Sequence, residues 1–153
     1  MSNLVRLMIR PKIEYNEEAN AFLAIAAEVR AGALRLLDST ILQFEVHNVI
    51  DDDKRTKILP HLELCSEHIH DSEEILSLGK RIQQNCHTRA RDALHIASAI
   101  LGNARYFLSC DNKVTQKKQA NCYRRLAKDF RNAYFSVMNP TMFVQEMNEG
   151  KLE

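Results

Sequence analysis

The stretch ARDALHIASAILGNARYFLSCDN, residues 90–112, decides the fold and raises the main chemical question. Residues 90–101 are almost all apolar and Gly102 follows them, which predicts a buried helix that ends at the glycine. Residues 105–110, RYFLSC, predict a buried strand. Asp92 lies at the start of the helix and Asp111 directly follows the strand. Two carboxylates thus bracket an apolar unit, and we expect them to belong to one polar site.

Helical and strand patterns alternate along the rest of the chain. Strands are predicted over 33–39, 67–71, 105–110 and 133–138, and helices over 17–31, 40–50, 51–65, 72–85, 90–101, 113–128 and after Pro140. We expect Pro60 to kink or divide its helix. The alternation predicts an α/β fold of three layers, with helices on both faces of a central parallel sheet. Residues 1–153 form a single domain in this interpretation.

Composition limits the class of protein. An apolar content of 45% in 153 residues is enough for one compact core. No apolar run is long enough to span a membrane, and the N-terminus lacks the pattern of a signal peptide. The cysteines are well separated and form no CxxC motif; they are Cys65, Cys86, Cys110 and Cys122. The simplest interpretation is a cytoplasmic protein whose thiols are reduced.

Charge is divided unevenly along the chain. Residues 1–75 carry 8 Lys/Arg against 14 Asp/Glu, whereas residues 76–153 carry 13 against 6. The basic half is therefore suited to a polyanion, although solvated helix faces would give the same pattern. Only three acids lie between Lys80 and Arg131, and two of them are Asp92 and Asp111.

Three acids from separate segments are expected at one edge of the sheet, because functional clefts of parallel sheets lie beyond the carboxyl ends of the strands. They are Glu45, Asp92 and Asp111. Each also has an ordinary explanation: Glu45 as a solvated charge, Asp92 as a helix N-cap, Asp111 as a turn residue. For His95, a hydrogen bond within the core is a better explanation than metal binding. Ligand-type residues near 65–71 (Cys65, His68, His70 and Asp71) form no tetrahedral spacing.

The motifs DALHIASA and FLSCD, at this spacing, closely resemble the C-terminal half of PIN domains, the fold of VapC-type toxin ribonucleases. LLDSTILQFEV resembles the family's second strand and its glutamate-bearing helix, and VMNPTMFVQEM resembles its closing strand and helix. The resemblance implies a parallel sheet of about five strands. It also implies a metal-dependent endoribonuclease that hydrolyses phosphodiester bonds of RNA, with an antitoxin protein as a possible partner and a homodimer as a possible assembly.

By resemblance, the catalytic and metal-binding acids are Glu45, Asp92 and Asp111, supported by Ser109, Asn112 and His95. Carboxylate oxygens suit Mg²⁺ or Mn²⁺, which would polarise a phosphate and activate water. The RNA backbone would be held by basic side chains of the second half, namely Arg89, Arg91, Lys113, Lys117 and Lys118.

The chain departs from the family pattern at its N-terminus. PIN domains begin with an apolar strand that ends in a metal-binding aspartate, whereas here Met1 or Leu4 would take that place, depending on the register. The central strand is expected to be shortened or absent, with residues 3–9 or a second chain filling the gap. The alternative function is therefore a non-catalytic PIN module that binds RNA or a protein partner.

Overall fold

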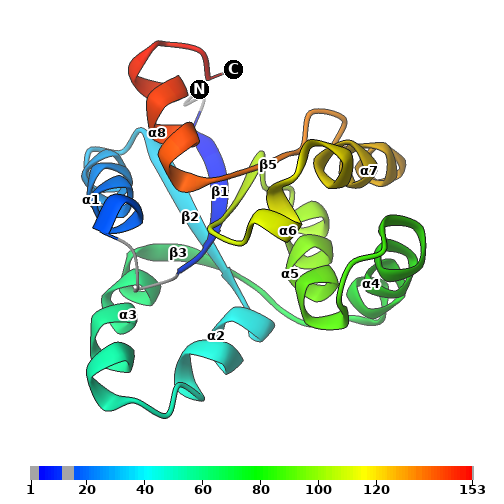
Figure 1. Ribbon diagram of the computed structural model, residues 1–153, viewed down its shortest axis with the longest axis horizontal. Coiled ribbons are helices and arrows are strands. Elements are labelled where there is room, and N and C mark those ends of the chain that lie inside the picture. The colour runs from blue at the N-terminus through cyan, green and yellow to red at the C-terminus, as the bar shows by residue number, and fades with distance from the viewer. Residues whose placement is uncertain (1–3, 12–15, 153) are drawn as a thin grey trace.

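The computed structural model of the protein describes residues 4–11 and 16–152. Its centre is an all-parallel sheet of five strands in the order β3-β2-β1-β4-β5 (Figure 1). The strands are β1 (Val5–Arg10), β2 (Leu34–Ser39), β3 (Cys65–Ile69), β4 (Tyr106–Ser109) and β5 (Ser136–Met138). The predicted fold class is confirmed.

Helices cover both faces of the sheet (Figure 1). They are α1 (Asn16–Arg30), α2 (Thr40–His47), α3 (Asp52–Leu64), α4 (Glu73–Cys86), α5 (Ala90–Leu101), α6 (Asn112–Thr115), α7 (Lys117–Ala127), a 3₁₀ turn (Lys128–Phe130) and α8 (Pro140–Asn148). Because side chains alternate along a strand, Leu7 and Ile9 of β1 pack with residues of α1 and α8, whereas Met8 packs with residues of α4, α5 and α7. Both sides of β1 are therefore core.

The buried helix predicted over residues 90–101 is observed as α5. Eight of its residues are buried, and it ends at Gly102. A Cβ atom at Gly102 would lie 2.7 Å from Cγ1 of Ile69 and 2.9 Å from the Ser98 carbonyl oxygen. The close approach of β3 thus requires a glycine at this position.

Contrary to expectation, the central strand is neither missing nor short. The six residues of β1 pair with β2 on one side and with β4 on the other. The prediction that residues 3–9 fill the gap is confirmed for residues 5–9, and no second chain is needed there. Met1 lies outside the described residues, and Leu4 precedes β1 instead of ending it. The residue at the carboxyl end of the central strand is Arg10.

Two helical predictions also need correction. The basic helix expected over 113–128 is divided into α6 and α7, because Gln116 takes an extended ψ of 144°. The helix α3 continues through Pro60, so the expected division of the helix there does not occur. No helix in the described part of the chain is long and apolar enough to cross a membrane.

The cysteines differ from the sequence interpretation as well. Cys86, the last residue of α4, and Cys122 of α7 form a disulfide, so the expectation that all thiols are reduced is wrong. These residues are 36 positions apart, and no local pattern relates them. They meet because α4 and α7 pack on the same face of the sheet.

Candidate functional site

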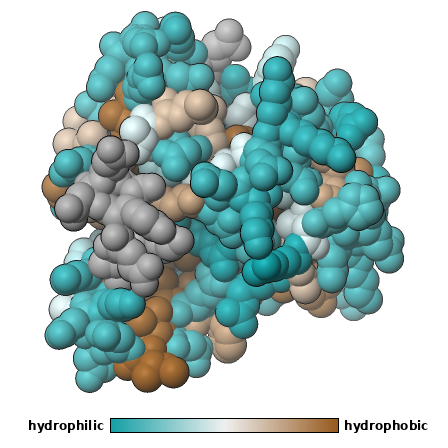
Figure 2. All heavy atoms as spheres, viewed as in Figure 1, coloured by the Kyte–Doolittle hydropathy of each residue, from teal (hydrophilic) through white to brown (hydrophobic). Residues whose placement is uncertain are grey.

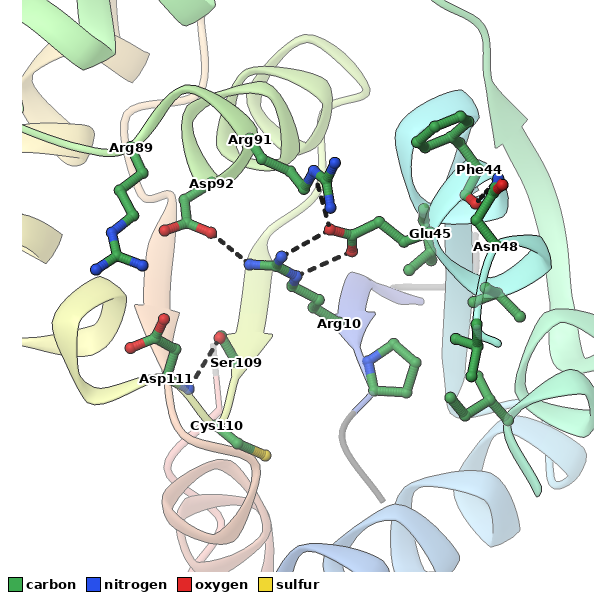
Figure 3. Close-up of a pocket in the computed structure, with 15 residues that line it drawn as sticks. Arg10, Phe44, Glu45, Asn48, Arg89, Arg91, Asp92, Ser109, Cys110 and Asp111 are labelled. Carbon is green, nitrogen blue, oxygen red and sulfur yellow. Dashed lines mark hydrogen bonds and ion pairs between the residues drawn. The ribbon is translucent and has the colours of Figure 1, made fainter. Parts of the chain in front are cut away.

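A hollow of about 860 Å³ opens at the carboxyl edge of the sheet, between α2, the start of α5 and the turn after β4 (Figure 3). The three predicted acids all border it, so the expected convergence of Glu45, Asp92 and Asp111 is observed. The other polar lining residues include Arg10, Arg89, Arg91 and Ser109. One wall is apolar and is formed mainly by α2, with Leu42, Phe44, Val46, Val49 and Ile58.

Arg10 lies at the centre of this arrangement. Its Nε donates to Glu45 Oε1 at 3.0 Å and its Nη2 to Glu45 Oε2 at 2.7 Å. Its Nη1 donates to Asp92 Oδ1 at 2.5 Å (Figure 3). The planar guanidinium therefore binds one carboxylate through two parallel bonds and the second carboxylate through its remaining nitrogen. Burial works to lower the pKa of Arg10, but both acids raise it, so the side chain remains charged.

Glu45 is held from three directions. In addition to Arg10, His95 Nε2 lies 2.8 Å from Glu45 Oε1, and Arg91 Nε lies 3.7 Å from Oε2. Burial would raise the pKa of Glu45, but the hydrogen bonds from His95 and Arg10 and their charges lower it to about 2. Glu45 is therefore an ionised, fixed carboxylate, and the interpretation of it as a solvated surface charge is wrong.

Asp92 does not cap its helix. The N-cap residue of α5 is Arg89, whose side chain makes no capping hydrogen bond, and Asp92 lies in the first turn with 8% of its surface exposed. Its carboxylate binds Arg10 instead. The interpretation of Asp92 as an N-cap is therefore wrong.

Asp111 has a local structural role. Its Oδ1 accepts a hydrogen bond from the Lys113 amide at 2.9 Å, and its own amide donates to Ser109 Oγ at 3.1 Å. These bonds begin α6 directly after β4. The turn interpretation of Asp111 is confirmed, and the carboxylate also borders the hollow.

The supporting residues divide into two groups. Ser109 and His95 are buried at 2% and 1% exposure, and His95 supports Glu45 from the core. Asn112 is exposed at the start of α6 and does not border the hollow.

The basic residues divide in the same way. Arg89 and Arg91 border the hollow, at the N-terminus of α5, where the helix dipole is positive. Lys113, Lys117 and Lys118 are exposed on α6 and α7 and do not line it. Atoms over α7 are mostly hydrophilic in the surface view (Figure 2).

Among the ligand-type residues near β3, His68 has a structural role. His68 Nδ1 binds Asp38 Oδ1 at 2.6 Å, and His68 Nε2 lies 3.3 Å from Thr40 Oγ1. Asp38 and His68 are direct neighbours in the β2–β3 ladder. These bonds tie β3 and the start of α2 to β2.

The residues of the hollow do not fit a divalent metal ion in this arrangement. Among residues 4–11 and 16–152, no three histidine, cysteine, aspartate or glutamate side chains lie close enough to share one. Arg10 occupies the space between Glu45 and Asp92, and its positive charge already neutralises part of theirs. A metal ion would have to displace it.

Sequence reasoning missed Arg10. The signal was present, because Arg10 ends the apolar run LVRLMIR and Pro11 follows it, which predicts the end of a strand there. A charged residue at the carboxyl end of an apolar strand is a site candidate in a parallel sheet. The family pattern predicts an aspartate at the end of this strand, and its two possible registers place Met1 or Leu4 there, not Arg10.

Comparisons of the chain with family models, with characterised proteins and with solved structures gave no significant match. The fold and the site define the class of protein: an α/β fold whose five-stranded parallel sheet is flanked by helices and carries a charged hollow at its carboxyl edge.

Proposed function

We propose that this chain is a PIN-like module that binds single-stranded RNA at the hollow and lacks metal-dependent cleavage in its present form. The observation that carries the proposal is the position of Arg10, which pairs with Glu45 and Asp92 where a nuclease would bind its metal. The resemblance of DALHIASA and FLSCD to PIN domains supports the class. The geometry therefore favours the non-catalytic alternative over the ribonuclease.

The surroundings of the hollow support RNA as the ligand. Arg89 and Arg91 lie beside the N-terminus of α5, whose dipole favours a phosphate. The Phe44 ring on the opposite wall is 52% exposed, and an unpaired base can stack on such a ring. A phosphate contact on one wall and a stacking surface on the other suit a single strand better than a duplex.

The test is a binding measurement by fluorescence anisotropy with a labelled single-stranded RNA in EDTA. The wild-type chain should bind the single strand more tightly than a duplex of the same sequence. The double variant Arg89→Ala/Arg91→Ala should bind about tenfold more weakly, with a salt slope smaller by about 1.4. The matched control is Arg35→Ala/Lys151→Ala, which removes two exposed charges outside the hollow and should bind like wild type.

Cleavage is measured on the same RNA with Mg²⁺ or Mn²⁺. We expect little or none, and any trace should be greater in Mn²⁺. Metal-dependent cleavage that disappears in both Asp92→Asn and Asp111→Asn would restore the ribonuclease interpretation. Equal binding by the arginine variant and its control would refute RNA binding at the hollow.

A further inference from the structure

The guanidinium of Arg10 is placed like a bound cation. It is supplied by the central strand, with strands on both sides, and it contacts one acid from α2 and one from α5 (Figure 3). Its side chain is 23% exposed, and those of Glu45 and Asp92 are 16% and 11% exposed. Two carboxylates so poorly solvated would repel each other without a positive charge between them.

The charge at position 10 decides what else the hollow can bind. As it stands, the charged lining residues are three arginines and three acids, namely Arg10, Arg89, Arg91, Glu45, Asp92 and Asp111. With a carboxylate at position 10, four acids would face two arginines, and the hollow would need two more positive charges to regain balance. One divalent ion supplies that amount. An arginine therefore carries the same net charge as an aspartate together with a divalent ion.

We infer that Arg10 acts as a resident cation in place of a divalent metal ion, and that residue 10 determines whether this hollow binds metal. This inference rests on the proposed function in one respect: the phosphate of RNA is taken to be what the hollow binds when no metal ion is present. Its test uses metal ions alone, so the two ideas can fail separately.

The experiment compares the wild-type chain with Arg10→Asp in titrations with MnCl₂, followed by the loss of the free Mn²⁺ signal in electron paramagnetic resonance. The wild-type chain should bind no Mn²⁺ saturably at millimolar concentrations. Arg10→Asp should bind about one ion per chain, at least about tenfold more tightly than wild type. Mg²⁺ should compete for this ion but bind more weakly.

Two further variants exclude simpler explanations. Arg10→Asp/Asp92→Asn keeps the new carboxylate but removes one partner, and it should lose most of the binding. Arg10→Asn removes the cation and adds only a neutral amide oxygen in place of a carboxylate, so its affinity should fall between those of wild type and Arg10→Asp. It also serves if Arg10→Asp folds poorly.

Thermal unfolding gives a second readout. Arg10→Asp should unfold at a lower temperature than wild type without metal, and Mn²⁺ should raise its midpoint selectively. Saturable Mn²⁺ binding by wild type as tight as that of Arg10→Asp would overturn the inference. So would Arg10→Asp and Arg10→Asn chains that bind no Mn²⁺ or stay unfolded in its presence, because Arg10 would then be only a structural ion-pair partner.

Discussion

Glu45 is the residue on which the hollow depends most directly. Its carboxylate connects α2 to the central strand β1 through Arg10, and to the buried helix α5 through His95. The ionised Glu45 carboxylate can only accept a hydrogen bond, so the proton between the two groups lies on His95 Nε2; the buried Nδ1 of His95 has no partner among the described residues. The direction of this hydrogen bond is therefore fixed, with His95 donating and Glu45 accepting.

The low pKa of Glu45 predicts a loss of stability in acid. Between its usual value of 4.5 and about 2, the unfolded chain binds a proton that the folded chain does not. The ionised Glu45 therefore contributes its full share of the free energy of unfolding above pH 4.5, and this share is lost as the pH falls toward 2. Because the site is partly solvated, we expect the share to be about 1–2 kcal/mol. Glu45→Gln should lose that much less stability than wild type between about pH 5 and about pH 2.5 in urea unfolding.

His61 is a second buried group with a shifted pKa, and its effect on stability in acid has to be separated from that of Glu45. Burial lowers the pKa of His61 from 6.5 to about 4, against smaller opposing effects of the Ile9 backbone and the Asp38 charge. The folded chain therefore binds fewer protons at His61, and this costs stability as the pH falls from 6.5 to 4. The loss is common to wild type and Glu45→Gln, so it cancels in the comparison. An unchanged difference between the two chains across the acid range would contradict the role of Glu45.

At the scale of elements, a disulfide and a side-chain hydrogen bond hold α7 to the segment between α4 and α5. The Cys86–Cys122 disulfide joins the end of α4 to α7, and Thr88 Oγ1 lies 3.0 Å from the Tyr123 hydroxyl oxygen. Both involve the short connection that leads into Arg89 and the start of α5. The position of the arginines at the hollow therefore depends on α7, which does not line it.

Opening this disulfide should destabilise the chain by about 3–4 kcal/mol, since it closes a loop of 36 residues. The measurement is urea unfolding of the oxidised chain and of Cys86→Ala/Cys122→Ala. Thiol titration of the denatured chain should find two fewer thiols before reduction than after it. Cys65 in β3 is a free cysteine, so Cys65→Ser should leave the difference in thiol count before and after reduction unchanged. Equal thiol counts before and after reduction would show that the disulfide does not form.

At the scale of the whole molecule, the sheet order makes β1 the centre of the fold although it lies at the start of the chain. Its neighbours β2 and β4 follow much later, and it is covered on one face by α1 and α8 and on the other by α4, α5 and α7. Phe44 of α2 and Ile50, between α2 and α3, are exposed apolar residues. The surface view shows hydrophobic atoms at the end of the molecule where α2 leads to α3 (Figure 2).

The central position of β1 predicts its exchange behaviour. The amides of Leu7, Met8 and Ile9 should be among the slowest to exchange with deuterium, because their strand opens only when the sheet does. The edge strand β5 has a single neighbour and should exchange faster. Hydrogen exchange with mass spectrometry measures both segments in one experiment. Exchange of β1 as fast as that of β5 would contradict this topology.

The sequence by itself determined the features that depend on neighbouring residues. The alternation of helices and strands, the end of α5 at Gly102 and the turn at Asp111 follow from local periodicity and from single residue types. The edge at which Glu45, Asp92 and Asp111 meet also followed, because the carboxyl ends of parallel strands share one edge.

Only the tertiary structure decided what binds those acids. Arg10 is 35 residues from Glu45 and 82 from Asp92, and no local pattern fixes which charges at such separations come together. The Cys86–Cys122 disulfide was hidden for the same reason. A strand's own residues predict that it is a strand, but its place in the sheet depends on the strands beside it. The central place of β1 in the sheet puts Arg10 between Glu45 and Asp92, and Arg10 then determines the charge of the site.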